Sequence, residues 1–232
     1  MLGYRSTSNR SQLGYVPSQT QQHTLIQRVS YLVASGLLVS ALSSYAFRGA
    51  VNYWLGFMIA MFALIFVMRM VARKPGINVL CFYLFSVAMG GMLGPLLMAY
   101  VKGFGADIVW ESFLLTAIAV IGIGGYAYTS GKDFGFLGRF LFWALLALII
   151  VGVLSWFVVS LNTPLIMLGY DCIGVAIFTG FLLYDFSNIR LRYSPEDYTI
   201  AATQVYLDFV NLFLFILNIL AILQGGGGTR RR

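Results

Sequence analysis

Residues 136–160 read FLGRFLFWALLALIIVGVLSWFVVS, and Arg139 is the one charged residue among them. A helix needs about 20 consecutive, mostly apolar residues to cross the hydrocarbon core of a bilayer, and this run is longer. It also lacks the alternation of apolar and polar residues that is typical of transmembrane β-strands. We therefore expect a membrane-spanning α-helix here.

Similar apolar runs lie on both sides of this one, separated by short connectors rich in Gly, Pro and charged residues, which end helices. The pattern predicts an all-α integral membrane protein, with a single seven-helix transmembrane domain over residues 25–223. The six further runs are 26–47, 53–72, 77–101, 107–129, 165–186 and 200–223.

The composition supports this fold class. Hydrophobic residues make up 59% of the 232 residues and charged residues 10%, whereas a soluble domain has about 45–50% and 25%. So few charges exclude a soluble enzyme and a disordered chain. The net charge of +7 is scattered among apolar runs and builds no basic face, so we expect the lipid bilayer, and no nucleic acid, as a partner.

Two polar segments flank the predicted domain. Residues 1–24 are rich in Ser, Gln, Tyr and Gly and include His23, the only histidine, which predicts a disordered cytoplasmic tail rather than a signal peptide. Placing His23 in this tail excludes a His-based site within the membrane. Residues 224–232 read QGGGGTRRR and predict a flexible tail or linker.

The basic residues predict the orientation in the membrane, because Lys and Arg concentrate in cytoplasmic loops. With a cytoplasmic N-terminus, the far side carries only Arg48 and Lys102, apart from the C-terminal tail. This bias fits a bacterial inner (plasma) membrane and an organelle membrane alike, and we expect the bacterial membrane. The cytoplasmic side would then hold Arg5, Arg10, Arg28, Arg69, Arg73, Lys74, Lys132, Arg139, Arg190 and Arg192.

Two aspartates fall inside the last two predicted helices, where a charge is costly and marks function. Asp185 lies 11 residues before Glu196, near the centre of the connecting loop, and Asp208 lies 12 residues after it. Equal distances from a turn give equal depth in an antiparallel helix pair, so the carboxyl groups should face each other. Two carboxylates that close share a proton or hold a cation. The spacing predicts a cation site and pH sensor.

Other polar residues are candidates for supporting roles. Arg69, near the inner end of the second helix, either pairs with Asp185 or extends to the interface. Asn188 and Asn211 follow the aspartates by three residues, on the same helical faces, and either supply neutral ligands or stabilise helix packing. Asp171 either lines a vestibule or reaches the outer interface.

The remaining motifs are structural. No P-loop, nucleophile elbow, HExxH or zinc-ligand spacing is present, so we expect no enzyme activity and no required cofactor. Cys81 and Cys172 lie in predicted spans, as buried apolar residues rather than a disulfide. Small-residue clusters in the third and fourth spans predict close helix packing; they are Gly90, Gly91 and Gly94, and Gly122, Gly124 and Gly125.

Several segments carry a recognisable pattern over residues 25–220. Leu183-Tyr184-Asp185, and the helix that runs from Asp197-Tyr198 through Ala201-Ala202 to Tyr206–Phe213, resemble the last two helices of the Bax-inhibitor-motif family. Lys132-Asp133-Phe134 and Met68-Arg69 are similar to two further motifs of that family. Phe186-Ser187-Asn188 departs from its usual Thr-Gln type of run, and the charged C-terminus of some eukaryotic members is absent.

The resemblance implies six helices around a central seventh, and a protein that leaks calcium across membranes in response to pH. It also implies that Asp185 and Asp208 are the family's paired aspartates and that Arg69 is its latching arginine.

Three hypotheses for function follow. The first is a pH-sensitive calcium or cation leak channel, gated by Asp185, Asp208 and the Arg69 latch, with Ca²⁺ as the bound and transported ion. The second is a proton-coupled cation transporter using the same pair. The third is a non-conducting regulator of a membrane protease or cell-death partner. We expect a monomer.

Overall fold

The computed structural model describes residues 19–71, 74, 76–158 and 163–227. These residues form helices and connecting loops, with no β-strand among them. The seven α-helices are long and apolar enough to span a membrane, which confirms the predicted fold class. In chain order the elements are α1 (Gln19–Ala46), η1 (Val51–Tyr53), α2 (Trp54–Val71), α3 (Ile77–Phe104), α4 (Asp107–Thr129), α5 (Leu137–Leu154), α6 (Pro164–Leu191), η3 (Pro195–Asp197) and α7 (Tyr198–Gly227).

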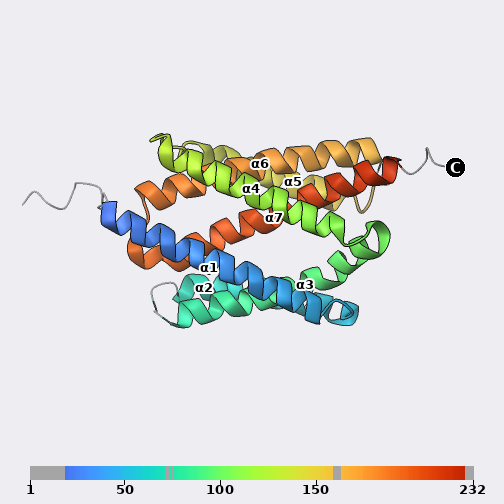
Figure 1. Cartoon of the computed structure of the whole chain (residues 1–232), viewed down its shortest axis with the longest axis horizontal. Coiled ribbons are helices and arrows are strands. Elements are labelled where there is room, and N and C mark those ends of the chain that lie inside the picture. The colour runs from blue at the N-terminus through green and yellow to red at the C-terminus, as the bar shows by residue number, and fades with distance from the viewer. Residues whose placement is uncertain (1–18, 72–73, 75, 159–162, 228–232) are drawn as a thin grey trace, which may run out of the picture.

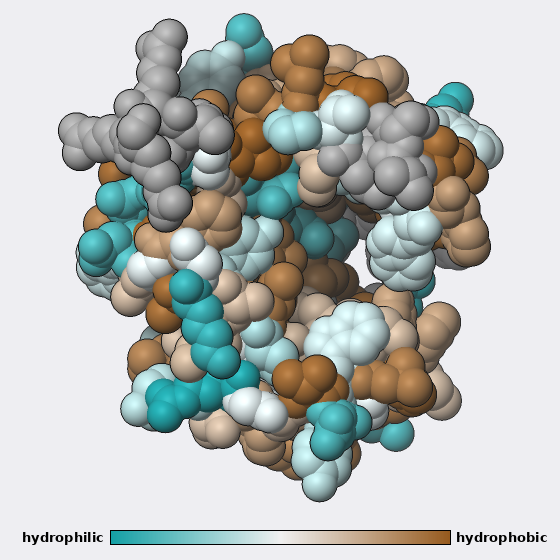
Figure 2. All heavy atoms as spheres, turned by 90° about the vertical axis from the view of Figure 1, so that its right-hand side faces the viewer, coloured by the Kyte–Doolittle hydropathy of each residue, from teal (hydrophilic) through white to brown (hydrophobic). Residues whose placement is uncertain are grey.

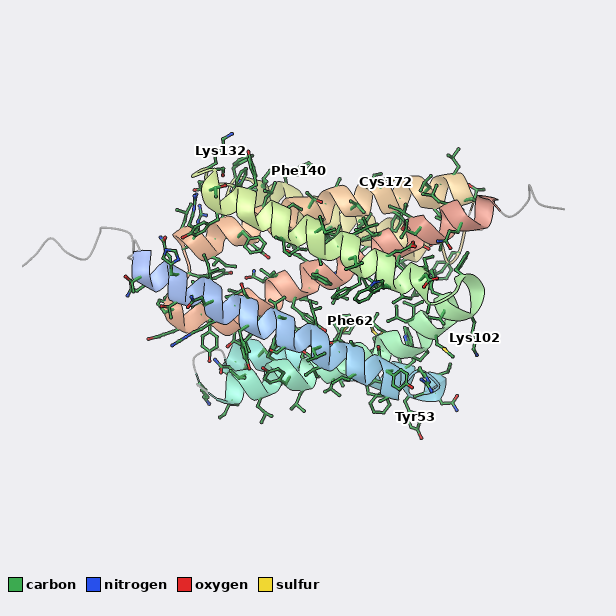
Figure 3. The ribbon with its side chains drawn as sticks, viewed as in Figure 1. Tyr53, Phe62, Lys102, Lys132, Phe140 and Cys172 are labelled. Atoms are coloured by element: carbon green, nitrogen blue, oxygen red, sulfur yellow. The ribbon has the colours of Figure 1, made fainter. Side chains whose placement is uncertain are left out.

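The helices run along one axis and reverse direction at each connection (Figure 1). The beginning of α1 and the α2–α3, α4–α5 and α6–α7 connections lie at one end of the bundle, which we call the Lys132 end. The other three connections lie at the opposite end, the Lys102 end. Figure 3 labels both lysines.

The helix α7 lies at the centre of the bundle. It lies between one group made of α1, α2 and α3 and another made of α4, α5 and α6 (Figure 1), and it packs directly on α1, α3, α4 and α6. The helices α2 and α5 pack mainly on α3 and α6. Figure 2 looks onto the Lys102 end, where a recess separates the two groups.

Tyr206 anchors α7 to the first group of helices. Its ring is fully buried and meets Phe82 and Phe85 of α3 edge to face. Its hydroxyl bonds to that of Ser40 in α1, and the Ser40 hydroxyl donates to the Ser86 carbonyl at 2.8 Å. Ser40 has only one hydrogen to donate, so Tyr206 is the donor in this chain of bonds across three helices.

Glycines let α1 and α3 approach closely, as the sequence predicts. A Cβ atom on Gly90 would lie 2.3 Å from the Ser40 carbonyl oxygen, and one on Gly94 would lie 2.6 Å from that of Ser44. In α4 the prediction holds only for Gly124, which meets the ring of Phe186. Gly122 and Gly125 face open space.

Four element boundaries correct the sequence prediction. The helix α5 ends at Leu154, six residues before the end of the predicted span, and α7 continues to Gly227, so residues 224–227 of the predicted flexible tail are helical. The helix α1 begins at Gln19, so residues 19–24 of the predicted tail are helical and His23 belongs to α1; residues 1–18 lie outside the described part. The helix α6 continues to Leu191, which places Arg190 in a helix rather than a loop. At the start of α1 and at the end of α6, polar residues extend the helix beyond the apolar run, by a length that hydropathy does not report.

Candidate ion site between helices α6 and α7

Asp185 and Asp208 meet at the interface of α6 and α7, as their spacing predicts. Their side chains lie within hydrogen-bonding contact of each other. Both residues are almost fully buried, with 4% and 6% of their surface exposed. Asp208 Oδ2 accepts no hydrogen bond from any donor group within the described residues, so a proton held between the two carboxyl groups would satisfy it.

The short connection between the helices sets the common depth of the pair. The helix α6 ends at Leu191 and α7 begins at Tyr198, with the η3 turn between them. Asp185 thus lies about 9 Å before the end of α6 and Asp208 about 15 Å into α7, at a rise of 1.5 Å per residue. The η3 turn begins with a capping box in which Ser194 and Asp197 bond reciprocally, and this fixes the reversal.

The two asparagines bond away from the pair. The Asn188 side-chain oxygen accepts a 2.9 Å hydrogen bond from Arg192. The Asn211 amide donates to the Leu207 carbonyl of its own helix at 2.8 Å. Their predicted role as neutral ligands therefore stays a prediction, since neither is shown bonded to a carboxyl group of the pair.

Arg69 does not approach either aspartate in this conformation. It is exposed in the last turn of α2 and forms no ion pair with a residue that the structure describes. It lines a small pocket of about 120 Å³ between α2 and α7, together with Gln204 and Leu207, which precede Asp208. A cation in the last turn of a helix is favourable. The role of Arg69 as a latch stays a prediction.

Asp171 occupies a second polar site, in the half of the bundle toward the Lys102 end. It is 2% exposed and accepts a 2.7 Å hydrogen bond from Asn218 of α7. Asn218 in turn accepts a 3.0 Å bond from the Tyr100 hydroxyl of α3. Asp171 thus lies inside the helix packing rather than at the outer interface, about 21 Å from Asp185 along α6.

An apolar barrier separates the two acidic sites. Phe178 lies midway between Asp171 and Asp185 along α6. The centre of its ring is 5.8 Å from that of Phe215 in α7. The Phe215 ring also lies against Gly174, where an added Cβ would come within 2.5 Å of the ring. These contacts place aromatic rings in the α6–α7 interface between the two sites.

A polar network that sequence reasoning missed lies at the Lys132 end. Arg190 is 9% exposed and donates to the Tyr128 and Lys132 carbonyls at 3.2 and 2.6 Å, with no carboxylate partner in the described chain. Nearby, Arg192 forms a 2.7 Å ion pair with Asp133. The Arg192 hydrogen bond, followed by that of the Gly135 amide, lowers the pKa of Asp133. The network ties the α4–α5 connection to α6.

Tyr193 closes the α6–α7 interface just beyond the pair. Its hydroxyl donates to the side-chain oxygen of Gln204. Burial, and then the negative charge of Asp185, raise the pKa of the Tyr193 phenol to about 12. The phenol therefore remains a donor at physiological pH.

The pair suits weak binding of a hard cation. Ionised carboxylates are oxygen ligands of the kind that Ca²⁺ prefers, but Ca²⁺ takes six to eight oxygens. No group of three or more His, Cys, Asp or Glu side chains that could hold a metal occurs within the described residues. Water or carbonyl oxygens would have to complete the coordination, which favours passage of an ion over its storage.

Fold and site together define a multi-pass membrane protein with a buried pair of acidic residues beside its central helix. The sequence matches the family model described as inhibitor of apoptosis-promoting Bax1 over residues 22–225. The chain belongs to this Bax inhibitor family of membrane proteins.

Individual relatives support this assignment. The chain is 35% identical to Bax inhibitor 1 of Schizosaccharomyces pombe over 147 residues, which are 63% of this chain and 53% of that protein. It is 29% identical to an uncharacterized protein of Campylobacter jejuni over 211 residues, 90% of this chain and 89% of the relative. A Golgi anti-apoptotic protein of vaccinia virus (strain Lister) is 32% identical over 161 residues, 68% of this chain and 64% of that protein. The chain thus matches less than two thirds of the yeast and viral relatives.

Proposed function

We propose that this protein is a pH-sensitive leak channel for calcium ions, in which Asp185 and Asp208 bind the passing ion. The observation that carries this proposal is the contact of two buried carboxyl groups in a membrane-spanning helix pair. Burying two acidic residues in a bilayer is costly, and ionisable residues within a membrane usually mark a path for ions or protons.

The pair gives the leak its dependence on pH. When the pair binds a proton it loses negative charge and attracts a cation less strongly, and when it loses the proton a divalent cation can replace it. The same exchange limits the time for which an ion stays bound, because protons compete for the oxygens. No further cofactor is needed for this cycle.

The described conformation corresponds to a closed channel in this proposal. The Phe178–Phe215 contact blocks the route toward Asp171, and the Tyr193–Gln204 bond closes the other side of the pair. The pocket beside Arg69 extends along α7 as far as Leu207, and Asp208 is not among its lining residues. Arg69 would act as a latch in a conformation in which the end of α2 moves closer to α7.

We place the Lys132 end in the cytoplasm, since it carries most of the basic residues, and we favour a bacterial inner membrane. Cys172 is exposed, contrary to the sequence prediction, whereas Cys81 is buried. Lys132→Cys and Lys102→Cys, at two exposed positions and each in a background with both native cysteines replaced by Ser, would test the topology. A membrane-impermeant maleimide added outside intact cells should label only the cysteine at position 102.

Calcium flux into proteoliposomes tests the proposal. Asp185→Asn and Asp208→Asn keep the side-chain volume but remove the charge, and we expect each to change the flux at least several-fold and to flatten its pH profile. Asp133→Asn is a matched control, because this carboxylate pairs with Arg192 in an exposed connection. Unchanged flux and an unchanged pH response in both pair variants would refute the proposal.

Two measurements in the same vesicles separate the other functions. Counterflow of protons in a fixed ratio to calcium would indicate a coupled transporter instead of a leak. A regulator that acts through its N-terminal segment would conduct no calcium and would lose its partner when residues 1–22 are deleted, whereas a leak would survive the deletion.

A further inference from the structure

A long groove runs along the bundle between α1 and α4, with α7 as its floor. In Figure 1, α7 is visible between these two helices. The groove has a volume of about 1100 Å³ and extends on α4 from Val109 to Tyr128. Phe209 and Phe213 of α7 lie on the floor.

The lining of the groove is almost entirely aliphatic and aromatic. His23, at the Lys132 end, is its only titratable group apart from the Tyr128 phenol, and the rings of these two residues lie 6.3 Å apart. No Asp, Glu, Lys or Arg side chain is among the lining residues, and neither Asp185 nor Asp208 reaches the groove. A groove of this character does not stabilise an ion, so it is separate from the proposed ion path.

The dimensions of the groove decide what can fill it. Its 19-residue length on α4 corresponds to about 30 Å, and its volume is about 1100 Å³. The space is therefore long relative to its width, which suits extended hydrocarbon chains.

We propose that this groove is a binding site for the acyl chains of a membrane phospholipid. Its walls belong to membrane-spanning helices, so hydrocarbon rather than water surrounds it. A lipid held there would fill the space between α1 and α4. The helix α1 packs mainly on α3 and α7, and α4 packs mainly on α7 and α6. The bound chains would lie over the face of α7 that carries Phe209 and Phe213.

Two glycines of α4 provide a matched test. An added Cβ meets nothing within 4 Å at either Gly122 or Gly125, but only Gly125 lines the groove. Gly125→Phe therefore fills the groove without a backbone clash, and Gly122→Phe places the same ring on the same helix outside it. Ala34→Leu reduces the groove from the α1 side.

The measurement is native mass spectrometry of protein that has been delipidated in detergent and then exposed to dioleoylphosphatidylglycerol or dioleoylphosphatidylcholine. We expect the unaltered protein and Gly122→Phe to retain lipid, and Gly125→Phe and Ala34→Leu to retain at least five-fold less. Both lipids should bind equally, because no Asp, Glu, Lys or Arg side chain lines the groove. Size-exclusion profiles identify any variant that fails to fold.

Equal retention by Gly122→Phe and a folded Gly125→Phe would overturn the proposal. Retention of the anionic lipid alone would also overturn it, because a headgroup site elsewhere would then hold the lipid. If Gly125→Phe does not fold, Ala34→Leu decides the same question from the opposite wall.

Discussion

Asn218 of α7 donates a 2.7 Å hydrogen bond to Asp171 of α6, ten residues beyond the point where α7 presents Asp208 to Asp185. Each buried acid of α6 thus has a polar partner on α7. The partners differ in kind, since an amide donor satisfies Asp171, whereas Asp185 faces another acid. This difference separates a structural carboxyl group from a candidate ion site.

The Asp171–Asn218 bond should contribute to stability. We expect Asn218→Leu to lower the free energy of unfolding by about 1–3 kcal/mol, because it leaves a buried acceptor without its donor. Thermal unfolding in detergent micelles measures the loss. The double variant Asp171→Leu/Asn218→Leu should lose less than the sum of the single variants; simple additivity would contradict the pairing.

Close packing of α1 on α3 should make Gly90 intolerant of a side chain. Gly90→Ala would push a methyl group into the Ser40 carbonyl, and we expect a loss of about 1–3 kcal/mol. Gly56→Ala in α2 meets nothing within 4 Å and should be neutral or stabilising by up to about 1 kcal/mol. Equal melting temperatures of the two variants would refute this account of the interface.

Arg190 should resist replacement even by lysine. Its guanidinium reaches two backbone carbonyls at once, and a single ammonium group cannot reproduce that fork. We expect Arg190→Lys to cost about 1–3 kcal/mol in chemical denaturation. Arg139→Lys, on the exposed start of α5, should change stability by less than about 0.5 kcal/mol; a similar loss there would point to a general need for arginine.

The Asp133–Arg192 ion pair should make a small, pH-dependent contribution to stability. The folded protein lowers the pKa of Asp133, so the stabilisation is present above the pKa of an unfolded aspartate, about 4, and is lost as the pH falls through the lower folded value. Both side chains are about half exposed, which limits the effect to about 1 kcal/mol or less.

The matching variant is Asp133→Asn, whose melting temperature should lie slightly below that of the unaltered protein at pH 7. The two melting temperatures should converge as the pH falls toward 3. A difference that grows on acidification would contradict the assigned sign.

The membrane-spanning fold and the meeting of Asp185 with Asp208 could be predicted from the sequence because both follow from regular geometry. Apolar runs of sufficient length predict spans, and equal distance from a turn predicts equal depth. The start of α1 at Gln19 and the position of Arg190 within α6 could not be predicted in this way. Polar residues continue both helices, and only tertiary hydrogen bonds, such as that from Gln22 to the Arg190 carbonyl, show where they end.

The hydrogen bonds and orientation of the supporting residues could not be predicted from the sequence either. Helical spacing places Asn188 on the same side of α6 as Asp185. Arg192, four residues further on, donates a hydrogen bond to the side-chain oxygen of Asn188. Likewise, Arg69 has a side chain long enough to reach either inward or outward. Which of two nearby partners a flexible polar group chooses depends on packing that no spacing rule contains.

The central position of α7 has a consequence for biosynthesis. This helix is the last of the seven to leave the ribosome, yet it packs on α1, α3, α4 and α6. Before α7 inserts, Tyr206 cannot contact Phe82 and Phe85. The faces of the other helices that pack on α7 then lack that packing partner. A nascent chain arrested before residue 198 would therefore leave these faces exposed to lipid.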